Sequence, residues 1–167
     1  MIKQALAGAV LIAVLGVSSG PALAQTDNDI YPPDEPRSLD LNAFATECVL
    51  DAPWVLYDII PQGFAASPPI ATITIRDVDG NVVDVLSDAP LSGRFLYPGA
   101  AVAADGTGTD WPGWDLIDGV WIELAPDEGD TILREGLDVQ VDVNPTGFTF
   151  VTYPAASPVC ANPPGSG

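Results

Sequence analysis

The chain has 167 residues, of which 23 are acidic and five are basic, so its formal net charge is −18 at neutral pH. A surface this acidic repels nucleic-acid phosphates and anionic lipid headgroups, and we expect neither as a partner. The sequence has no histidine and only one lysine, Lys3, which removes the commonest general base, the commonest metal ligand and most amine chemistry.

The first 24 residues have the pattern of a cleaved secretory signal. Lys3 provides a positive start, residues 5–17 are apolar, and Ala22-Leu23-Ala24 is the small-x-small pattern that signal peptidase accepts. The apolar run is shorter than the roughly 20 residues that span a bilayer, so we expect export and no membrane span after cleavage. Cleavage after Ala24 leaves four arginines against 23 acidic residues, a formal charge of −19.

The segment at 25–47 is rich in proline and acidic residues, which predicts an exposed tether. Apolar and polar residues then alternate at 71–76 and 137–143, and this period of two predicts half-buried strands. Further strands are expected at 54–60, 81–87, 91–97, 148–153 and on both sides of Asp118-Gly119, a dipeptide typical of hairpin turns.

Seven or eight short strands predict an all-β fold, a single immunoglobulin-like antiparallel sandwich at 48–161 followed by a flexible tail at 162–167. Cys48 and Cys160 are the only cysteines and bracket this domain. In an exported chain the default is one intramolecular disulfide, which we predict here. The alternatives are a reactive thiol or a metal-binding pair.

Several segments together carry a family resemblance: CVLDAPWVLYD at 48–58, PLSGRFLYPG at 90–99, TDWPGW at 109–114, NPT at 144–146, VTYP at 151–154 and CANPP at 160–164. In this order they resemble a recurrent domain of exported, cell-wall-anchored surface proteins of actinobacteria. The resemblance implies a surface location and supplies no catalytic residues. Members commonly end in an LPxTG sorting signal, which this sequence lacks, so we expect a freely secreted or loosely wall-held protein.

Two acidic loops are candidate calcium sites. Asp77, Asp79, Asn81 and Asp84 resemble the start of a calcium loop, but Gly80 is the fourth residue where an EF-hand requires glycine sixth. We favour a tight turn in which Gly80 or Asn81 adopts a positive φ. The loop at 105–110 could also offer oxygen ligands to a cation, although we favour a solvated loop.

Trp111-Pro112-Gly113-Trp114 is the candidate ligand-binding motif. Two indoles separated by a Pro-Gly turn could form a platform that stacks on sugar rings. The alternative, which we favour, is that these indoles pack within the domain, as do Trp54 and Trp121.

These observations predict a non-catalytic module of the cell envelope that acts as a spacer or interaction domain. A carboxylate pair is the catalytic device left to such a chain, and 23 acidic residues would place some pair at a suitable distance by chance. The alternatives are a carbohydrate-binding module using Trp111 and Trp114, or a calcium-dependent surface module. We expect no other cofactor, a monomer, and cell-wall polymers or surface proteins as partners.

Overall fold

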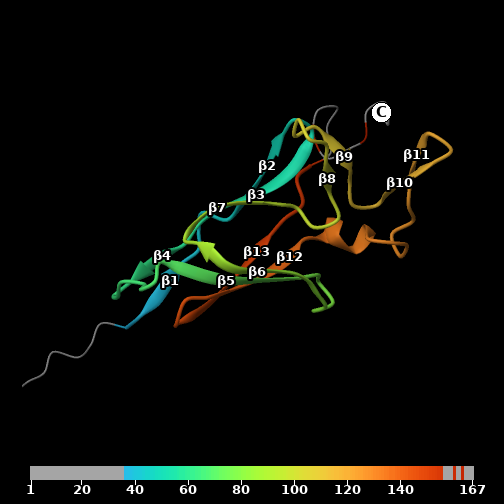
Figure 1. The fold of residues 1–167 in the computed structure, drawn as a ribbon. Coiled ribbons are helices and arrows are strands. Elements are labelled where there is room, and N and C mark those ends of the chain that lie inside the picture. Colours follow the sequence, from blue (N-terminus) through green and yellow to red (C-terminus); the bar gives the residue numbers. More distant parts are fainter. Residues whose placement is uncertain (1–35, 156–159, 161–162, 164–167) are drawn as a thin grey trace, which may run out of the picture. The chain divides into compact units, whose positions relative to one another are not determined.

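The computed structural model describes residues 36–155, Cys160 and Pro163, all within one compact unit, Glu35–Gly167 (Figure 1). The predicted signal peptide, the first part of the predicted tether and all of the tail except Pro163 lie outside the described residues. Within them the chain forms thirteen strands and one short 3₁₀ helix, η1 (Thr131–Glu135). The prediction of an all-β fold is confirmed.

Two antiparallel sheets form the body of this unit. The strand orders are β13-β12-β5-β6 in one sheet and β2-β3-β7 in the other. Their bounds are β2 (Ala45–Val49), β3 (Ala52–Asp58), β5 (Ile70–Arg76), β6 (Val82–Pro90), β7 (Ser92–Leu96), β12 (Leu137–Asp142) and β13 (Thr146–Val151). Six of these seven strands match predicted ones, whereas β2, which begins inside the predicted tether, is not among the predicted strands.

The inner faces of the two sheets share one hydrophobic core. Alternate residues of a strand face the same side, so the predicted alternation in β5 and β12 buries Ile73, Ile75, Val139 and Val141. Side chains of β3 and β7 belong to the same buried cluster, including Val55, Tyr57 and Phe95. The arrangement is sandwich-like, and the immunoglobulin-like strand order stays a prediction.

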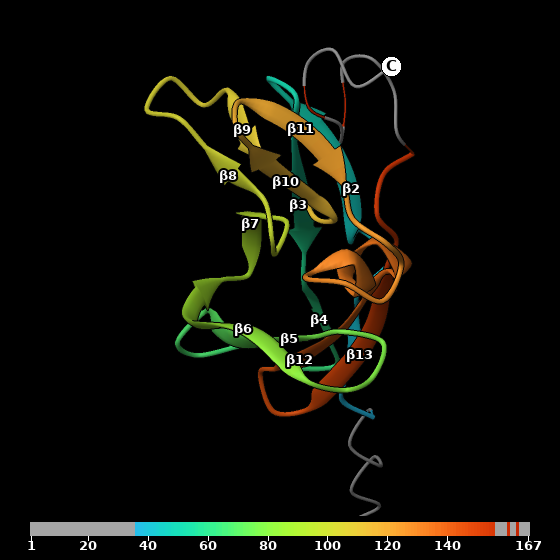
Figure 2. The same ribbon diagram turned by 90° about the vertical axis from the view of Figure 1, so that its right-hand side faces the viewer.

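Three two-stranded ribbons extend the sheets and raise the strand number above the predicted seven or eight. They pair β1 (Ser38–Asp40) with β4 (Ile60–Gln62), β8 (Ala101–Val102) with β9 (Gly108–Asp110), and β10 (Trp114–Ile117) with β11 (Val120–Glu123). Both views place the β1–β4 ribbon and the β10–β11 hairpin at opposite ends of the domain (Figures 1 and 2).

The predicted tether is wrong at its C-terminal end. Residues 38–40 form β1, β2 begins at Ala45, and Leu41 is buried in the core. The physical reason is compositional, because the prolines of this segment end at Pro36 and the following stretch contains Leu39, Leu41 and Phe44, which pack on the core.

The predicted disulfide between Cys48 and Cys160 is confirmed. Cys48 lies in β2, the two Cα atoms are 5.5 Å apart, and the residues are separated by 112 positions. Asp51 also forms a parallel β-bridge with Cys160, so the chain beyond β13 returns to the β2–β3 turn. Across 36–155, no helix has the length and apolar character that crossing a membrane requires.

Candidate functional site

The β10–β11 hairpin presents exposed aliphatic side chains on one face. Its register pairs Ile117 with Val120 and Asp115 with Ile122. Because paired and alternate residues share a side, Ile117, Val120 and Ile122 lie on the same face, which we call the aliphatic face and which has Asp115 at its edge. Their exposed fractions are 50%, 62% and 44%, so this face is open to solvent.

The opposite face of the hairpin is directed at the rest of the domain. Trp114 and Trp121 on this face are half-buried, whereas Leu116 near the turn is exposed. The ring of Trp121 makes an edge-to-face contact with Trp111, with 5.4 Å between ring centroids. The hairpin therefore has one face anchored by aromatic packing and one face free.

The turn of the hairpin is the one that its sequence predicts. Asp118 and Gly119 have φ values of 50° and 80°. Two successive positive φ angles define the type I′ turn, whose twist matches that of the flanking strands. The strands are thus held in a fixed register up to the tip.

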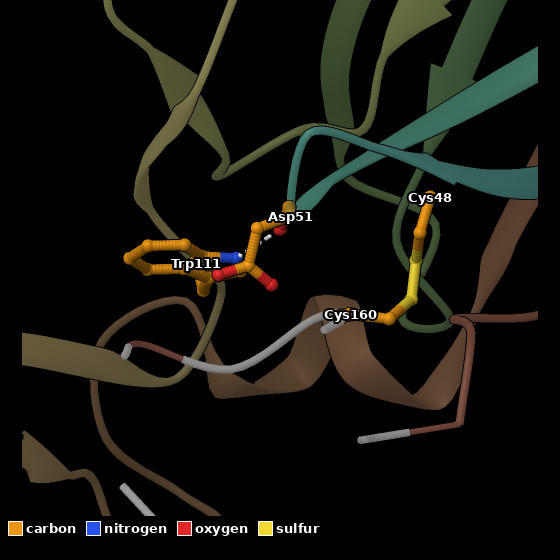
Figure 3. The surroundings of a disulfide bond; sticks show 4 residues. All are labelled: Cys48, Asp51, Trp111 and Cys160. Atoms are coloured by element: carbon orange, nitrogen blue, oxygen red, sulfur yellow. Dashed lines mark hydrogen bonds between the residues drawn. A yellow bond between two sulfur atoms is a disulfide. The ribbon is translucent and has the colours of Figure 1, made fainter. Parts of the chain in front are cut away.

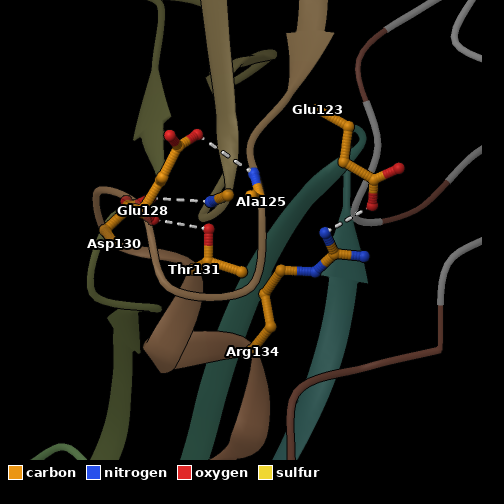
Figure 4. A network of polar contacts seen from close by, with 7 residues as sticks. Glu123, Ala125, Glu128, Asp130, Thr131 and Arg134 are labelled. Carbon is orange, nitrogen blue, oxygen red and sulfur yellow. Dashed lines mark hydrogen bonds and ion pairs between the residues drawn. The ribbon is translucent and has the colours of Figure 1, made fainter.

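Polar contacts fix the base of the hairpin (Figure 4). Arg134 Nη1 of η1 forms an ion pair with Glu123 Oε1 at 2.7 Å. The N–H of Gly113 donates to Asp130 Oδ1 at 2.6 Å, and the carbonyl of Gly113 accepts from the N–H of Leu124 at 2.9 Å. These contacts hold both strands of the hairpin against the segment that leads into η1.

Glu128 closes the loop that joins the hairpin to η1 (Figure 4). Its carboxylate accepts the N–H of Ala125 at 3.3 Å, and its carbonyl accepts the hydroxyl of Thr131 at 2.7 Å. The loop is therefore ordered by its own hydrogen bonds next to the hairpin base.

Trp111 connects the hairpin base to the disulfide region. Its side chain is 1% exposed, and its Nε1–H donates to the carbonyl oxygen of Asp51 at 2.8 Å. Figure 3 shows the indole beside Asp51, with the Cys48–Cys160 bond nearby. Trp111 is thus a packing residue that joins β9, the β2–β3 turn and the hairpin.

The candidate stacking platform of Trp111 and Trp114 is not formed, and Trp111 packs within the domain, as the favoured alternative predicts. With 1% of Trp111 exposed, its ring offers no face to a ligand. Trp114 is half-buried, and its indole nitrogen is enclosed without a hydrogen-bond partner among the described residues. Trp111 packs in this way because its large indole lies between the hairpin residue Trp121 and Asp51 of the β2–β3 turn.

The predicted turn at Asp77 is confirmed in detail. The backbone N–H and the side-chain amide of Asn81 donate to the two oxygens of Asp77 at 2.8 and 2.9 Å, and Gly80 has a φ of 86°. The hydrogen bond from the Asn81 amide is the main reason that the pKa of Asp77 lies below its usual range. Both oxygens of the first predicted calcium ligand are therefore engaged within the protein.

The other predicted ligands are spread along the turn and the following strand. Asp79 is exposed in the turn, whereas Asp84 lies in β6. Over residues 36–155, no group of three acidic or cysteine side chains is placed to hold a metal ion. Calcium binding by this segment stays a prediction.

The acidic loop between β8 and β9 is ordered by short-range hydrogen bonds. Asp105 Oδ1 accepts the N–H of Thr107 at 3.0 Å, and this interaction lowers the pKa of Asp105. Asp110 at the end of β9 accepts the N–H of Trp111, but burial raises the pKa of Asp110. The two carboxylates thus lie in different surroundings.

The surface around the hairpin is acidic. Asp115 and Asp118 are exposed on the hairpin, and Asp127 and Glu128 are exposed in the loop that follows. The neighbouring guanidinium of Arg134 is already paired with Glu123. A partner that covers the aliphatic face therefore meets a rim of negative charge.

The exposed face of the hairpin was not predicted, although its amino-acid sequence indicates it. Trp114-Asp-Leu-Ile and Val120-Trp-Ile-Glu carry apolar residues at both odd and even positions. A two-stranded ribbon can bury only one of its faces on the domain, so such a pattern requires that the other be exposed. The apolar residues at both odd and even positions are therefore the sequence feature that indicates an exposed apolar face.

No protein-family model matches this chain, and neither the curated proteins nor the solved structures provide a significant match.

Proposed function

We propose that this protein is an exported, non-catalytic interaction module of the cell envelope, and that the aliphatic face of the β10–β11 hairpin binds a partner protein. The observation that carries the proposal is the exposure of Ile117, Val120 and Ile122 on a hairpin whose base is fixed. Contiguous apolar surface on a soluble domain is typical of a protein–protein contact.

The fixed hairpin base supports this function energetically. Binding loses affinity when side chains or loops must be ordered on association. Here the type I′ turn, the Trp111–Trp121 contact and the Arg134–Glu123 ion pair order the hairpin beforehand. The aliphatic face can therefore associate without ordering its backbone.

Charge argues for a partner protein with basic residues around an apolar site. Asp118 at the tip would have to leave water if the hairpin entered a bilayer, which is costly. A second copy of a chain with net charge −18 would be repelled. A basic rim on the partner would instead pair with Asp115 and Asp118.

Export is supported by the sequence and by the disulfide. The leader at 1–24 has the n-region, apolar run and cleavage pattern of a secretory signal. A disulfide that joins two distant segments suits an oxidising compartment. The resemblance to exported actinobacterial surface proteins supports the same location.

The proposal is tested by following the protein and two matched variants in the producing cell. Ile117→Thr/Val120→Thr removes apolar contact while it keeps β-branched side chains, and should move protein from the envelope fraction to the medium. Val82→Thr/Val85→Thr is the control, because these valines of β6 are similarly exposed, at 55% and 46%, but lie away from the hairpin. The mature protein should begin at Gln25 by mass spectrometry.

Two outcomes would contradict the proposal. Recovery of the uncleaved precursor in the cytosol would contradict the proposed export. Equal distribution of the hairpin variant, the control variant and the wild type between envelope and medium would contradict the aliphatic face as the binding surface.

A further inference from the structure

A polar cavity lies at the opposite end of the domain from the hairpin, between the β1–β4 ribbon and β13. Its volume is about 410 Å³, within the range of small-ligand sites. The polar side chains that line it are Ser38, Asp40, Asn42, Gln62 and Thr149. Hydroxyl, amide and carboxylate groups therefore dominate its chemistry.

A glycine shapes this cavity by letting β1 approach β13. A Cβ atom on Gly147 would lie 2.9 Å from Leu41 Cδ1 and 3.3 Å from a methyl carbon of Leu39. Leu41 is buried in the core, so little space exists for the adjustment. The absence of a side chain at 147 thus fixes the distance between the two walls.

Phe148 also lines the cavity and is unusually exposed. It follows Gly147 in β13 and is 73% exposed, although burial of an aromatic ring is strongly favourable. Its neighbour in β12 is Gln140, which accepts a hydrogen bond from Arg76 at 3.1 Å and donates one to Asp142 at 2.9 Å. Phe148 is therefore both a lining residue of the cavity and the strand neighbour of the hydrogen-bonded Gln140.

The polar lining residues and the exposed Phe148 ring together indicate which class of ligand fits the cavity. An apolar lipid or peptide would not match walls of hydroxyl and amide groups, and an anionic ligand would be repelled by Asp40 and by the net charge of −18. A sugar ring matches both parts, because its hydroxyls pair with polar side chains and its C–H face packs on an aromatic ring. Neutral saccharides remain as the fitting class.

We propose that the cavity between β1 and β13, together with the Phe148 ring, binds a neutral glycan, for which chitin and cellulose serve as the probes. Ser38, Asn42 and Gln62 hydrogen-bond the hydroxyls of one sugar unit, and Phe148 packs against the C–H face of that unit or the next. This site is separate from the aliphatic face of the hairpin and does not depend on it.

The test is retention of the purified mature protein on insoluble chitin and cellulose, with soluble chitotriose and cellotriose as competitors. Phe148→Ser and Gln62→Ala should each weaken retention about tenfold, which corresponds to about 1.4 kcal/mol. Both residues are exposed, so each variant should keep the circular dichroism spectrum and melting midpoint of the wild type. Val82→Thr/Val85→Thr of β6, which belongs to neither proposed surface, is the control and should be retained like the wild type.

The two polymers distinguish which kind of neutral glycan is bound. Retention on chitin alone indicates that an N-acetyl group contributes, and retention on cellulose alone indicates an unsubstituted glucan. Failure of the wild type to be retained on either polymer overturns the site. So does retention that Gln62→Ala leaves unchanged, because adhesion through the Phe148 ring alone requires no polar cavity.

Discussion

Asp51 combines several constraints in one residue. Its carbonyl oxygen accepts the hydrogen bond from Trp111, it forms the β-bridge with Cys160, and its φ is 69°. Its carboxylate gains little from these contacts, because Oδ1 is buried without a hydrogen-bond partner among the described residues. Desolvation accordingly raises the pKa of Asp51. The backbone contacts of Asp51 therefore stabilise the fold, whereas its ionised carboxylate does not.

Replacement of Asp51 by asparagine should therefore raise the melting temperature at pH 7. An acid whose pKa is raised on folding is ionised at a cost in the folded state, and this cost is present above the folded pKa. It disappears as the pH falls through the folded pKa toward the unfolded value near about 4. Melting curves of wild type and Asp51→Asn at pH 7 and pH 4 should show a gain that shrinks on acidification.

Asparagine is chosen because it tolerates the left-handed backbone region almost as aspartate does. Asp51→Ala removes the same charge but adds backbone strain of about 1 kcal/mol, so it separates the two effects. A lower melting temperature for Asp51→Asn at pH 7 would mean that the carboxylate has a stabilising partner, and would contradict this account.

Among the elements, the strands predicted most closely are those in which apolar and polar residues alternate. β5 and β12 alternate apolar and polar residues over six or seven positions, and each was predicted close to its observed bounds. β8 and β9 have two and three residues, and their pairing depends on the turn between them and on contacts with distant segments. No local pattern of that length distinguishes a strand from a loop.

In the candidate site, features with a local sequence signal were likewise predicted, whereas contacts between distant residues were not. The hairpin was predicted because Asp118-Gly119 is a local signal, and the size of an indole favours packing for Trp111, but no local pattern indicates its partner Asp51, which lies 60 positions away. The cavity beside Phe148 likewise requires β1 and β13 to meet from opposite ends of the domain sequence. Side-chain exposure at such places follows from tertiary contacts that composition does not report.

The hairpin turn provides a prediction at this scale. A Cβ atom on Gly119 would meet nothing within 4 Å, so Gly119→Ala introduces only backbone strain at a φ of 80°. A strain of about 1 kcal/mol should make the amides of β10 and β11 exchange with solvent about fivefold faster. Amides of β12 should be unchanged, and Gly119→Asn should show a smaller effect. Uniform acceleration across both sheets would show instead that the hairpin opens only with global unfolding.

At the scale of the whole molecule, the β10–β11 hairpin and the β1–β4 ribbon, which carry the two proposed surfaces, lie at opposite ends of the domain (Figures 1 and 2). The aliphatic face is held by polar contacts around Arg134 and Asp130, and the cavity by the approach of β1 to β13. A domain that bound a glycan at one end and a protein at the other would connect the two. Such a bridging role would require that the strands between the ends stay paired, and it would therefore depend on the stability of the domain.

The disulfide is the covalent contribution to that stability. It closes a loop of 112 positions, and for a loop of about 100 residues the chain-entropy model gives about 4.7 kcal/mol. Cys48→Ala/Cys160→Ala, or reduction of the wild type, should therefore lower the free energy of unfolding by a few kcal/mol in urea titrations. The denaturant slope should rise, because an unfolded chain without the cross-link exposes more surface. Reductant should leave the free energy of unfolding of the double variant unchanged. An equal free energy of unfolding for the oxidised and reduced wild type would contradict this prediction, because it would show that native contacts alone hold Cys160 against β2.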